Sequence, residues 1–177
     1  MKILKFGGTS VGSASRIKKL VSLINDNQSK IIVLSAISGT TNELVRFSNL
    51  INQNEYQSAQ ECSQNLKRQY IELIDELFSS NEYKNKGEEI INHHFSFIDS
   101  YNFKALNLFK EKTILAQGEI LSTTLFQHYL TECKIESVLL SALNFMRIDE
   151  NGEPKQAYIE EMLSKELSQY QNQTIFI

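Results

Sequence analysis

Residues 5–12, with the sequence K-F-G-G-T-S-V-G, constrain the fold of this chain more than any other segment. They follow residues 1–4, a short apolar run that predicts a strand at the start of the chain. They precede a segment whose apolar residues recur at helical spacing, namely Ile17, Leu20, Val21 and Ile24. Residues 5–12 are therefore predicted to form a turn between a strand and a helix.

The residue types in this turn suit the binding of an anion. Gly7 and Gly8 have no Cβ, so their backbone can adopt positive φ and let a ligand approach closely. We expect Thr9 and Ser10 to cap the helix that follows. The amides at the start of that helix would then face the carboxyl edge of the sheet, where oriented N–H groups and the helix dipole favour a phosphate.

Two common phosphate-binding motifs do not fit the turn. Ser13 stands where the P-loop pattern G-x-x-x-x-G-K-[ST] requires lysine, and glycines at 7, 8 and 12 do not match the dinucleotide pattern G-x-G-x-x-G. The lysine of this chain comes earlier, at Lys5, at the end of the predicted strand. Its ammonium could neutralise phosphate oxygens during phosphoryl transfer. The alternative is a surface lysine beside an ordinary tight turn.

A second turn with similar chemistry follows. After a polar break at residues 25–29, residues 30–34 are consecutively apolar beyond Lys30, which predicts a strand buried on both faces and parallel to the first. Residues 35–42 then gather hydroxyl groups before a helix that is expected to begin near Glu43. Ligands bind at the carboxyl ends of parallel strands in open α/β sheets. The alternative is a helix cap within a flexible turn.

The middle of the chain is predicted to be helical. From residue 54 to 108 there is neither a strand signal nor a proline, and apolar residues recur on one helical face before and after a break expected at Lys86-Gly87. We expect an antiparallel helical insertion over about 54–110, packed on one side of the sheet. His93 and His94 are not expected to bind a metal, because adjacent helical residues point to different sides and no third ligand is near.

The segment 112–130 also has a helical pattern, interrupted by Gly118-Glu119. A carboxylate among apolar neighbours is costly unless a cation pairs with it, so Glu119 is either a binding residue or simply exposed to solvent. Beyond it, residues 135–140 predict a third strand and residues 145–147 a short extended piece. We expect Arg147 and Asp149 to form an ion pair that fixes the next loop. A helix over residues 158–167 and a strand from residue 174 follow.

Composition excludes several classes of protein. The 177 residues suit one domain, and a net charge of −3 with a pI near 5.7 gives no electrostatic case for nucleic acid or an anionic membrane. No run approaches the roughly 18 apolar residues of a membrane-spanning helix, and no signal peptide precedes the first strand, so we expect a cytoplasmic protein. Cys62 and Cys133 are isolated in the sequence and are expected to stay reduced.

Four stretches in the same order resemble the aspartokinases of the amino-acid kinase superfamily. They are K-F-G-G-T-S-V at residues 5–11, V-L-S-A with S-G-T-T-N between residues 33 and 42, Q-G-E-I-L-S at 117–122 and F-M-R-I-D at 145–149. The resemblance spans nearly the whole chain. It implies a three-layer α/β/α fold built on an open, mostly parallel sheet, here truncated and carrying the helical insertion.

The resemblance also implies an activity and a set of site residues. Aspartokinases use ATP, with Mg²⁺, to phosphorylate the β-carboxylate of L-aspartate to 4-phospho-L-aspartate, the first step of lysine, threonine and methionine biosynthesis. In this chain the catalytic residue would be Lys5, and Thr41 and Glu119 would bind aspartate, with Gln117 assisting. The residues that bind ATP would be Lys5, Phe6, Gly7, Gly8 and Ser35. The family resemblance implies a homo-oligomer in the full-length enzyme and no site for a resident metal.

Aspartokinases continue beyond the last predicted strand into stretches that hold the nucleotide and the substrate carboxylate, and then into regulatory ACT domains. Nothing in residues 1–177 resembles these parts. We therefore expect an N-terminal, amino-acid-binding lobe that is inactive on its own. The alternatives are the N-terminal part of a bifunctional aspartokinase–homoserine dehydrogenase, another kinase of the superfamily, or a non-catalytic ligand-binding module.

Overall fold

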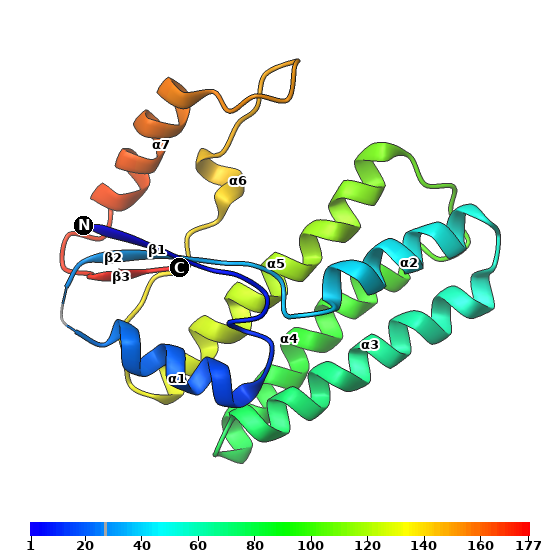
Figure 1. Cartoon of the computed structure of the whole chain (residues 1–177), viewed down its shortest axis with the longest axis horizontal. Helices are drawn as coiled ribbons and strands as arrows, with labels where there is room; N and C mark the ends of the chain where they lie inside the picture. The colour runs from blue at the N-terminus through cyan, green and yellow to red at the C-terminus, as the bar shows by residue number, and fades with distance from the viewer. Residues whose placement is uncertain (27) are drawn as a thin grey trace.

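A parallel sheet and a bundle of helices share one core in the computed structural model, which describes residues 1–26 and 28–177 (Figure 1). Asn27, part of the predicted polar break, lies outside the described residues. The elements in chain order are β1 (Lys2–Phe6), α1 (Ala14–Ile24), β2 (Lys30–Leu34), α2 (Thr40–Asn52), α3 (Tyr56–Leu77), α4 (Asn81–Asp99), α5 (Leu108–Glu132), α6 (Ala142–Phe145), α7 (Gln156–Ser168) and β3 (Ile175–Phe176).

The sheet has the strand order β1-β2-β3, and all its strands are parallel. The pairing of Lys5 with Val33 and of Phe6 with Leu34 brings the carboxyl ends of β1 and β2 to the same edge. The predicted strand–helix–strand crossover is therefore confirmed. It places the first and second turns next to each other.

The strand predicted over residues 135–140 is reduced to a single bridge. Val138 pairs in parallel with Phe176, donates its amide to the Ile175 carbonyl at 3.0 Å and accepts from the Ile177 amide at 2.9 Å. The extended piece predicted over residues 145–147 is confirmed in part. Phe145 ends the short helix α6, whereas Met146 is extended and Ile148 forms an antiparallel bridge with Pro154.

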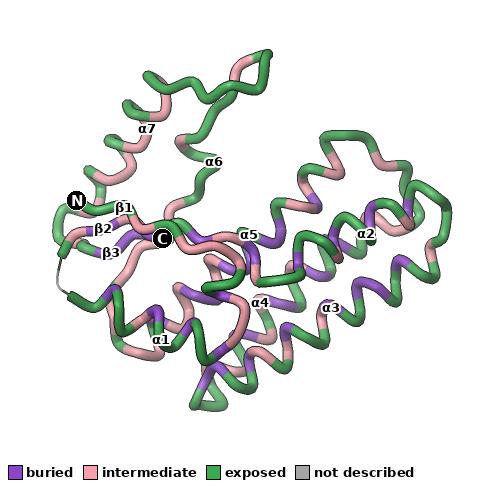
Figure 2. The backbone as a smooth tube through the Cα atoms, in the orientation of Figure 1, coloured by how far each residue is buried: buried purple, intermediate pink, exposed green. Residues whose placement is uncertain are grey.

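Helices α1 and α7 lie on opposite sides of the sheet, which gives the three layers expected (Figure 1). The two faces of β2 are not equally covered, however. Ile32 and Leu34 are 1% and 5% exposed, whereas Val33 between them is 44% exposed. The prediction of a strand buried on both faces is therefore wrong. The reason is that α6 and α7 contribute no buried residue, so their side of the sheet is only partly covered (Figure 2).

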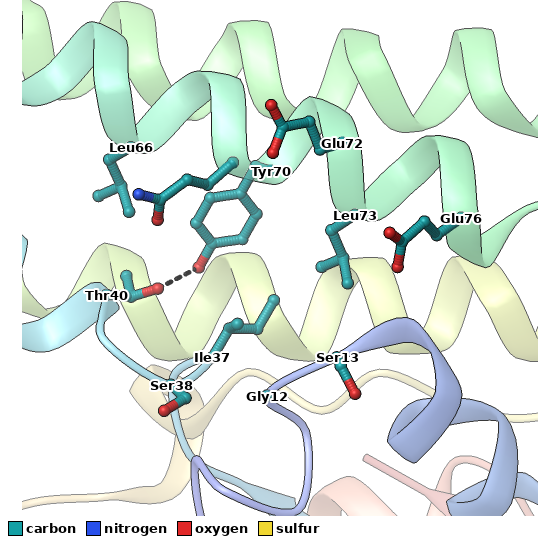
Figure 3. A pocket seen from close by; sticks show the side chains of 11 residues that line it. Gly12, Ser13, Ile37, Ser38, Thr40, Leu66, Tyr70, Glu72, Leu73 and Glu76 are labelled. Carbon is teal, nitrogen blue, oxygen red and sulfur yellow. Dashed lines mark hydrogen bonds between the residues drawn. The ribbon is translucent and has the colours of Figure 1, made fainter.

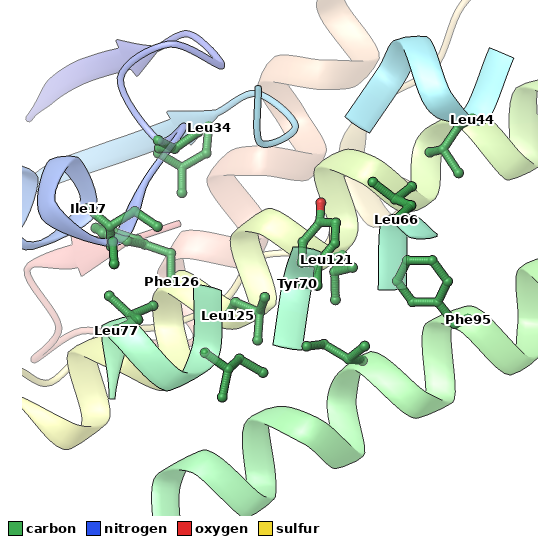
Figure 4. Close-up of a cluster of buried hydrophobic side chains, with 14 of the residues drawn as sticks. Ile17, Leu34, Leu44, Leu66, Tyr70, Leu77, Phe95, Leu121, Leu125 and Phe126 are labelled. Carbon is green, nitrogen blue, oxygen red and sulfur yellow. The ribbon is translucent and has the colours of Figure 1, made fainter. Parts of the chain in front are cut away.

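The predicted helical insertion is confirmed as α3 and α4, but its position is corrected. These helices pack on α1, α2 and α5 and so extend the core away from the sheet. Side chains from both regions form one continuous cluster, from Ile17 and Leu34 beside the sheet to Phe95 in the bundle (Figure 4). Among the described residues, no helix is both long and apolar enough to cross a membrane.

The helix break predicted at Lys86-Gly87 is wrong. Chain reversal occurs at residues 78–80, where the side chain of Ser80 accepts the Tyr83 amide and caps α4. Gly87 lies inside α4 and is buried, and a Cβ added to it would lie 2.9 Å from Cδ1 of Ile74. This glycine therefore permits a close approach of α3 and α4.

The loop after α6 is fixed differently from the prediction. The Asp149 carboxylate accepts the amides of Asn151 at 2.8 Å and Glu153 at 2.9 Å, and these backbone hydrogen bonds, chiefly that from Glu153, lower its pKa. The guanidinium of Arg147 lies over the ring of Tyr158, 4.9 Å from its centroid. The ion pairs found among the described residues do not include Arg147 and Asp149. The predicted ion pair is therefore replaced by a turn and a cation–π contact.

A buried lysine joins the end of α1 to the start of β2. Lys30 is 0% exposed, and its ammonium donates to the Ile24 carbonyl and to the carboxylate of Asp26. The hydrogen bond from Lys30 is the chief reason that the pKa of Asp26 is lowered from its ordinary value of 3.8. A buried ammonium is tolerated only when it is paired and hydrogen-bonded, so Asp26 is important to the fold.

We predict that Asp26→Asn lowers the free energy of unfolding at pH 7 and makes it less dependent on pH in acid. A carboxylate with a lowered pKa in the folded state stabilises the protein above its unfolded pKa and loses this effect as the pH falls through the folded value. Urea denaturation from pH 7 to pH 3, with Glu150→Gln in an exposed loop as the control, measures both effects. If the free energy of unfolding falls equally between pH 7 and pH 3 in the wild type and in Asp26→Asn, this role is contradicted.

Candidate active site

The first turn, residues 7–13, leaves backbone donors open above the carboxyl end of β1. A Cβ added to Gly7 would meet only Nζ of Lys5, at 3.9 Å, so the lysine side chain folds back over the glycine. The amides of Gly7 and Gly8 donate to no protein acceptor within residues 1–26 and 28–177. Lys5 is exposed and forms none of the ion pairs found in the same residues. An ammonium and two open amides together suit a phosphate.

The predicted caps of α1 are wrong. The helix begins at Ala14 with Ser13 at the N-cap position. Thr9 and Ser10 instead close the turn, because the Ser10 amide donates to the Gly7 carbonyl at 2.8 Å and the Thr9 carbonyl accepts from Arg16 at 2.7 Å. The turn is therefore held by a backbone hydrogen bond and by the guanidinium of Arg16 rather than by side-chain capping from Thr9 or Ser10.

The second turn, residues 35–39, lies directly against the first. A Cβ on Gly8 would come within 2.8 Å of the Ala36 carbonyl oxygen, and one on Gly12 within 2.9 Å of Cβ of Ser38. Real Cβ atoms essentially never come so close. Glycine at these two positions is therefore what allows the turns to touch.

Helix α5 meets the second turn in the same way. A Cβ on Gly118 would lie 2.9 Å from Cβ of Ala36 and 3.2 Å from Cγ2 of Thr40. The next residue, Glu119, reaches back to the turn, and its Oε1 accepts the Ala36 amide at 3.3 Å. Glu119 is exposed, so the expectation of a carboxylate among apolar neighbours is wrong. Gly118 takes the buried position, and Glu119 projects outward one residue later.

The other predicted residues lie around this contact with different exposures. Thr41 is exposed in the first turn of α2, directly after Thr40, and Ser35 is half-buried at the end of β2. Phe6 is half-buried, its side chain packs against the core, and its carbonyl accepts the Ser35 amide at 3.1 Å. The structure thus places Lys5 and Glu119 beside two touching turns, with Thr41 next to that contact.

Gln117 is not part of this surface. It is buried and faces α4, where its Oε1 lies 2.8 Å from Nδ1 of His94. Burial is the main reason that the pKa of His94 is lowered. The expectation that Gln117 assists substrate binding is therefore corrected to a structural contact between α4 and α5. No group of three or more His, Cys, Asp or Glu side chains that could hold a metal ion is found in the described part of the chain.

A cavity of about 210 Å³ lies beside the site but does not contain it (Figure 3). It is lined by the end of the first turn, the second turn, the start of α2 and α3, and Ser13, Thr40 and Tyr70 are among its lining residues. Lys5, Thr41 and Glu119 do not line it. The predicted site residues therefore lie on an open surface at the carboxyl edge of the sheet.

The residues that hold this surface together were not among the predicted site residues. Ala36 touches both neighbouring segments, and Gly12 and Gly118 provide the room for close contact. The available signal was the repeated occurrence of small residues within the motifs, which typically marks a close approach of backbones. Hydroxyl-bearing and charged residues were predicted as site residues because their side chains can bind a ligand directly, which small residues cannot do.

Comparison with protein-family models matches residues 1–173 of the chain to the amino acid kinase family. The aspartokinase of Rickettsia prowazekii (strain Madrid E) is 51% identical over 51 residues, which are 27% of this chain and 11% of that protein. The bifunctional aspartokinase/homoserine dehydrogenase of Buchnera aphidicola (subsp. Acyrthosiphon pisum, strain APS) is 28% identical over 162 residues, which are 85% of this chain and 20% of that protein. The matched region is thus a small part of both relatives.

Solved structures support the same fold. Aspartokinase III of E. coli in complex with lysine and aspartate matches with a TM-score of 0.82 and 22% identity, over 100% of this chain and 40% of that chain. The same enzyme in complex with aspartate and ADP matches with a TM-score of 0.78 and 20% identity, over 99% of this chain and 40% of that chain. From its family match over residues 1–173 and its fold, this chain belongs to the amino acid kinase family.

Proposed function

We propose that the chain is the amino-acid-binding lobe of an aspartokinase, which transfers the γ-phosphoryl group of ATP to the β-carboxylate of L-aspartate. The observation that carries this proposal is the contact of both turns and Gly118 at Ala36, which gathers the segments bearing Lys5, Thr41 and Glu119 at one edge of the sheet. The curated aspartokinase relatives and the fold of E. coli aspartokinase III support it.

The first turn would hold the phosphoryl group during transfer. A β-carboxylate oxygen of aspartate attacks the γ-phosphorus, the bond from that phosphorus to the bridging oxygen breaks, and ADP leaves as the acyl phosphate forms. Negative charge spreads over the transferring oxygens, so catalysis rests on positioning and charge stabilisation. The Lys5 ammonium and the open amides of Gly7 and Gly8 supply hydrogen-bond donors and positive charge for these oxygens. The nucleotide would bring Mg²⁺, which neutralises phosphate charge, and the half-buried Ser35 would line the ATP site.

The second turn and α5 would hold aspartate. The Glu119 carboxylate uses Oε1 for the Ala36 amide, which leaves Oε2 able to accept the α-ammonium of the amino acid. The hydroxyl of Thr41, exposed at the start of α2, can donate to a substrate carboxylate without adding charge. The groups for the nucleotide base and the second carboxylate would come from the C-terminal lobe, with ACT domains beyond it.

A bifunctional aspartokinase–homoserine dehydrogenase is the second candidate for the full-length protein. It is favoured by the Buchnera relative, which matches 85% of this chain. The length of the parent gene decides between the two enzymes. Catalysis of the first step of lysine, threonine and methionine biosynthesis and homo-oligomeric assembly belong to the same proposal and rest on the family resemblance. A cytoplasmic location is also part of the proposal. A non-catalytic ligand-binding module is the remaining alternative.

We predict that Lys5→Ala in the full-length protein lowers kcat about 10²- to 10³-fold, the usual cost of removing one charge-stabilising donor. The KM for aspartate should change much less, since Thr41 and Glu119 remain. A coupled assay of ADP release measures both constants. Lys2→Ala, at an exposed lysine of the same strand, is the matched control and should retain activity. Unchanged turnover in Lys5→Ala would rule out the proposed role.

We predict that residues 1–177 alone release no ADP in the presence of aspartate, because the proposed site takes essential groups from a second lobe. The same assay, together with calorimetric titration of aspartate and ATP into the isolated chain, measures this. Binding of aspartate without turnover supports an amino-acid-binding lobe, and binding of neither ligand favours a structural role. Aspartate-dependent release of ADP by the isolated chain would show that the lobe is sufficient.

A further inference from the structure

A buried hydrogen bond ties the inserted helix α3 to the start of α2, directly after the second turn. The hydroxyl groups of Thr40 and Tyr70 lie 2.8 Å apart (Figure 3). The two residues are only 3% and 2% exposed. They are 30 positions apart in the sequence, so the bond joins the start of α2 to the middle of α3.

Thr40 lies between the two residues proposed to bind aspartate. It is the first residue of α2 and directly precedes Thr41. Its Cγ2 would lie 3.2 Å from a Cβ on Gly118, the residue before Glu119. The side chain of Thr40 therefore touches α5 through its methyl group and α3 through its hydroxyl.

The position of the Tyr70 hydroxyl is fixed by the helical bundle. Its ring packs edge-on against Phe95, with 5.9 Å between the ring centroids. Leu66 and Ile74, one turn away on either side, are buried in the same core. Burial is the main reason that the pKa of Tyr70 is raised, with the nearby charge of Glu119 adding to the effect. The phenol thus stays neutral and lies within electrostatic reach of Glu119.

The hydroxyl is not needed to fill space, since phenylalanine would occupy the same volume in the core. A buried hydroxyl contributes only when it is hydrogen-bonded, and Thr40 is its partner. The two hydroxyls therefore form a specific connection between α3 and the start of α2, where the second turn ends. Such a pair restricts the turn in a way that apolar packing alone would not.

We infer that Tyr70 is a positioning residue for aspartate: its hydroxyl fixes Thr40 and thereby the placement of Thr41 relative to Glu119. The inference rests on the proposed function, because it assigns Tyr70 a role in binding that substrate. It also gives the inserted helix α3 an influence, through Thr40, on the affinity for the amino acid. Tyr70 acts through Thr40 and would not touch the substrate.

Steady-state kinetics of the full-length protein tests the inference with Tyr70→Phe, Thr40→Val and the double variant. Each single change removes one hydroxyl and keeps the volume, and Thr40→Val also keeps the methyl group against Gly118. We expect each to raise the KM for aspartate about fivefold, the factor that corresponds to one net hydrogen bond. The kcat and the KM for ATP should stay within about twofold, since the first turn is unchanged. The double variant should resemble the singles rather than their product, because one shared interaction is lost.

Tyr129→Phe is the matched control, since Tyr129 lies on α5 about ten residues, or roughly 15 Å, beyond Glu119. It should leave the KM for aspartate unchanged. If Tyr70→Phe does not fold, as judged by its thermal transition, the KM for aspartate of Thr40→Val is used to test the inference. A lower thermal midpoint with an unchanged KM for aspartate, or multiplicative effects in the double variant, would overturn the inference while the proposed function stands. A wild type without aspartate-dependent turnover would overturn both.

Discussion

The contact of three segments at Ala36 is the constraint on which this structure depends. Gly8, from the first turn, and Gly118, from α5, both approach Ala36 at distances that leave no room for a side chain. Backbones held this closely cannot shift independently, because protein interiors are packed too densely to absorb even a methyl group without adjustment. The arrangement brings residues from opposite halves of the chain to one edge of the sheet.

The helical bundle supports this contact from behind. Helix α2 begins at the site and α5 passes it at Gly118, and α3 and α4 pack against these helices in one continuous apolar core that reaches the sheet. Gly87 permits α3 and α4 to approach closely, and Thr40 and Tyr70 link α3 to the start of α2. The opposite face of the sheet is less well covered, as the 44% exposure of Val33 indicates. The site is therefore supported mainly by the helical bundle and much less by α6 and α7 on the other face of the sheet.

Local sequence patterns predicted the order of the helices and strands better than they predicted the burial and packing of individual residues. The alternation of apolar runs and helical spacing was sufficient for β1, α1, β2 and the long helices, because each pattern is set by its own segment. Burial was not predictable for Val33, because it depends on which distant helix covers the strand. Gly87 was misinterpreted because a glycine within a helical pattern can mark either a break or a close packing contact. Gln117 stands next to a functional motif in the sequence, yet helical geometry turns it toward His94.

A crystal structure of the full-length protein with aspartate and ADP bound tests the proposed site most directly. We expect the α-ammonium of aspartate within hydrogen-bonding distance of Glu119 and Thr41 in contact with the same molecule. The Lys5 ammonium and the Gly7 and Gly8 amides should face the transferred phosphoryl position. Aspartate bound away from Glu119, or a Lys5 side chain directed away from the phosphates, would contradict the proposed site.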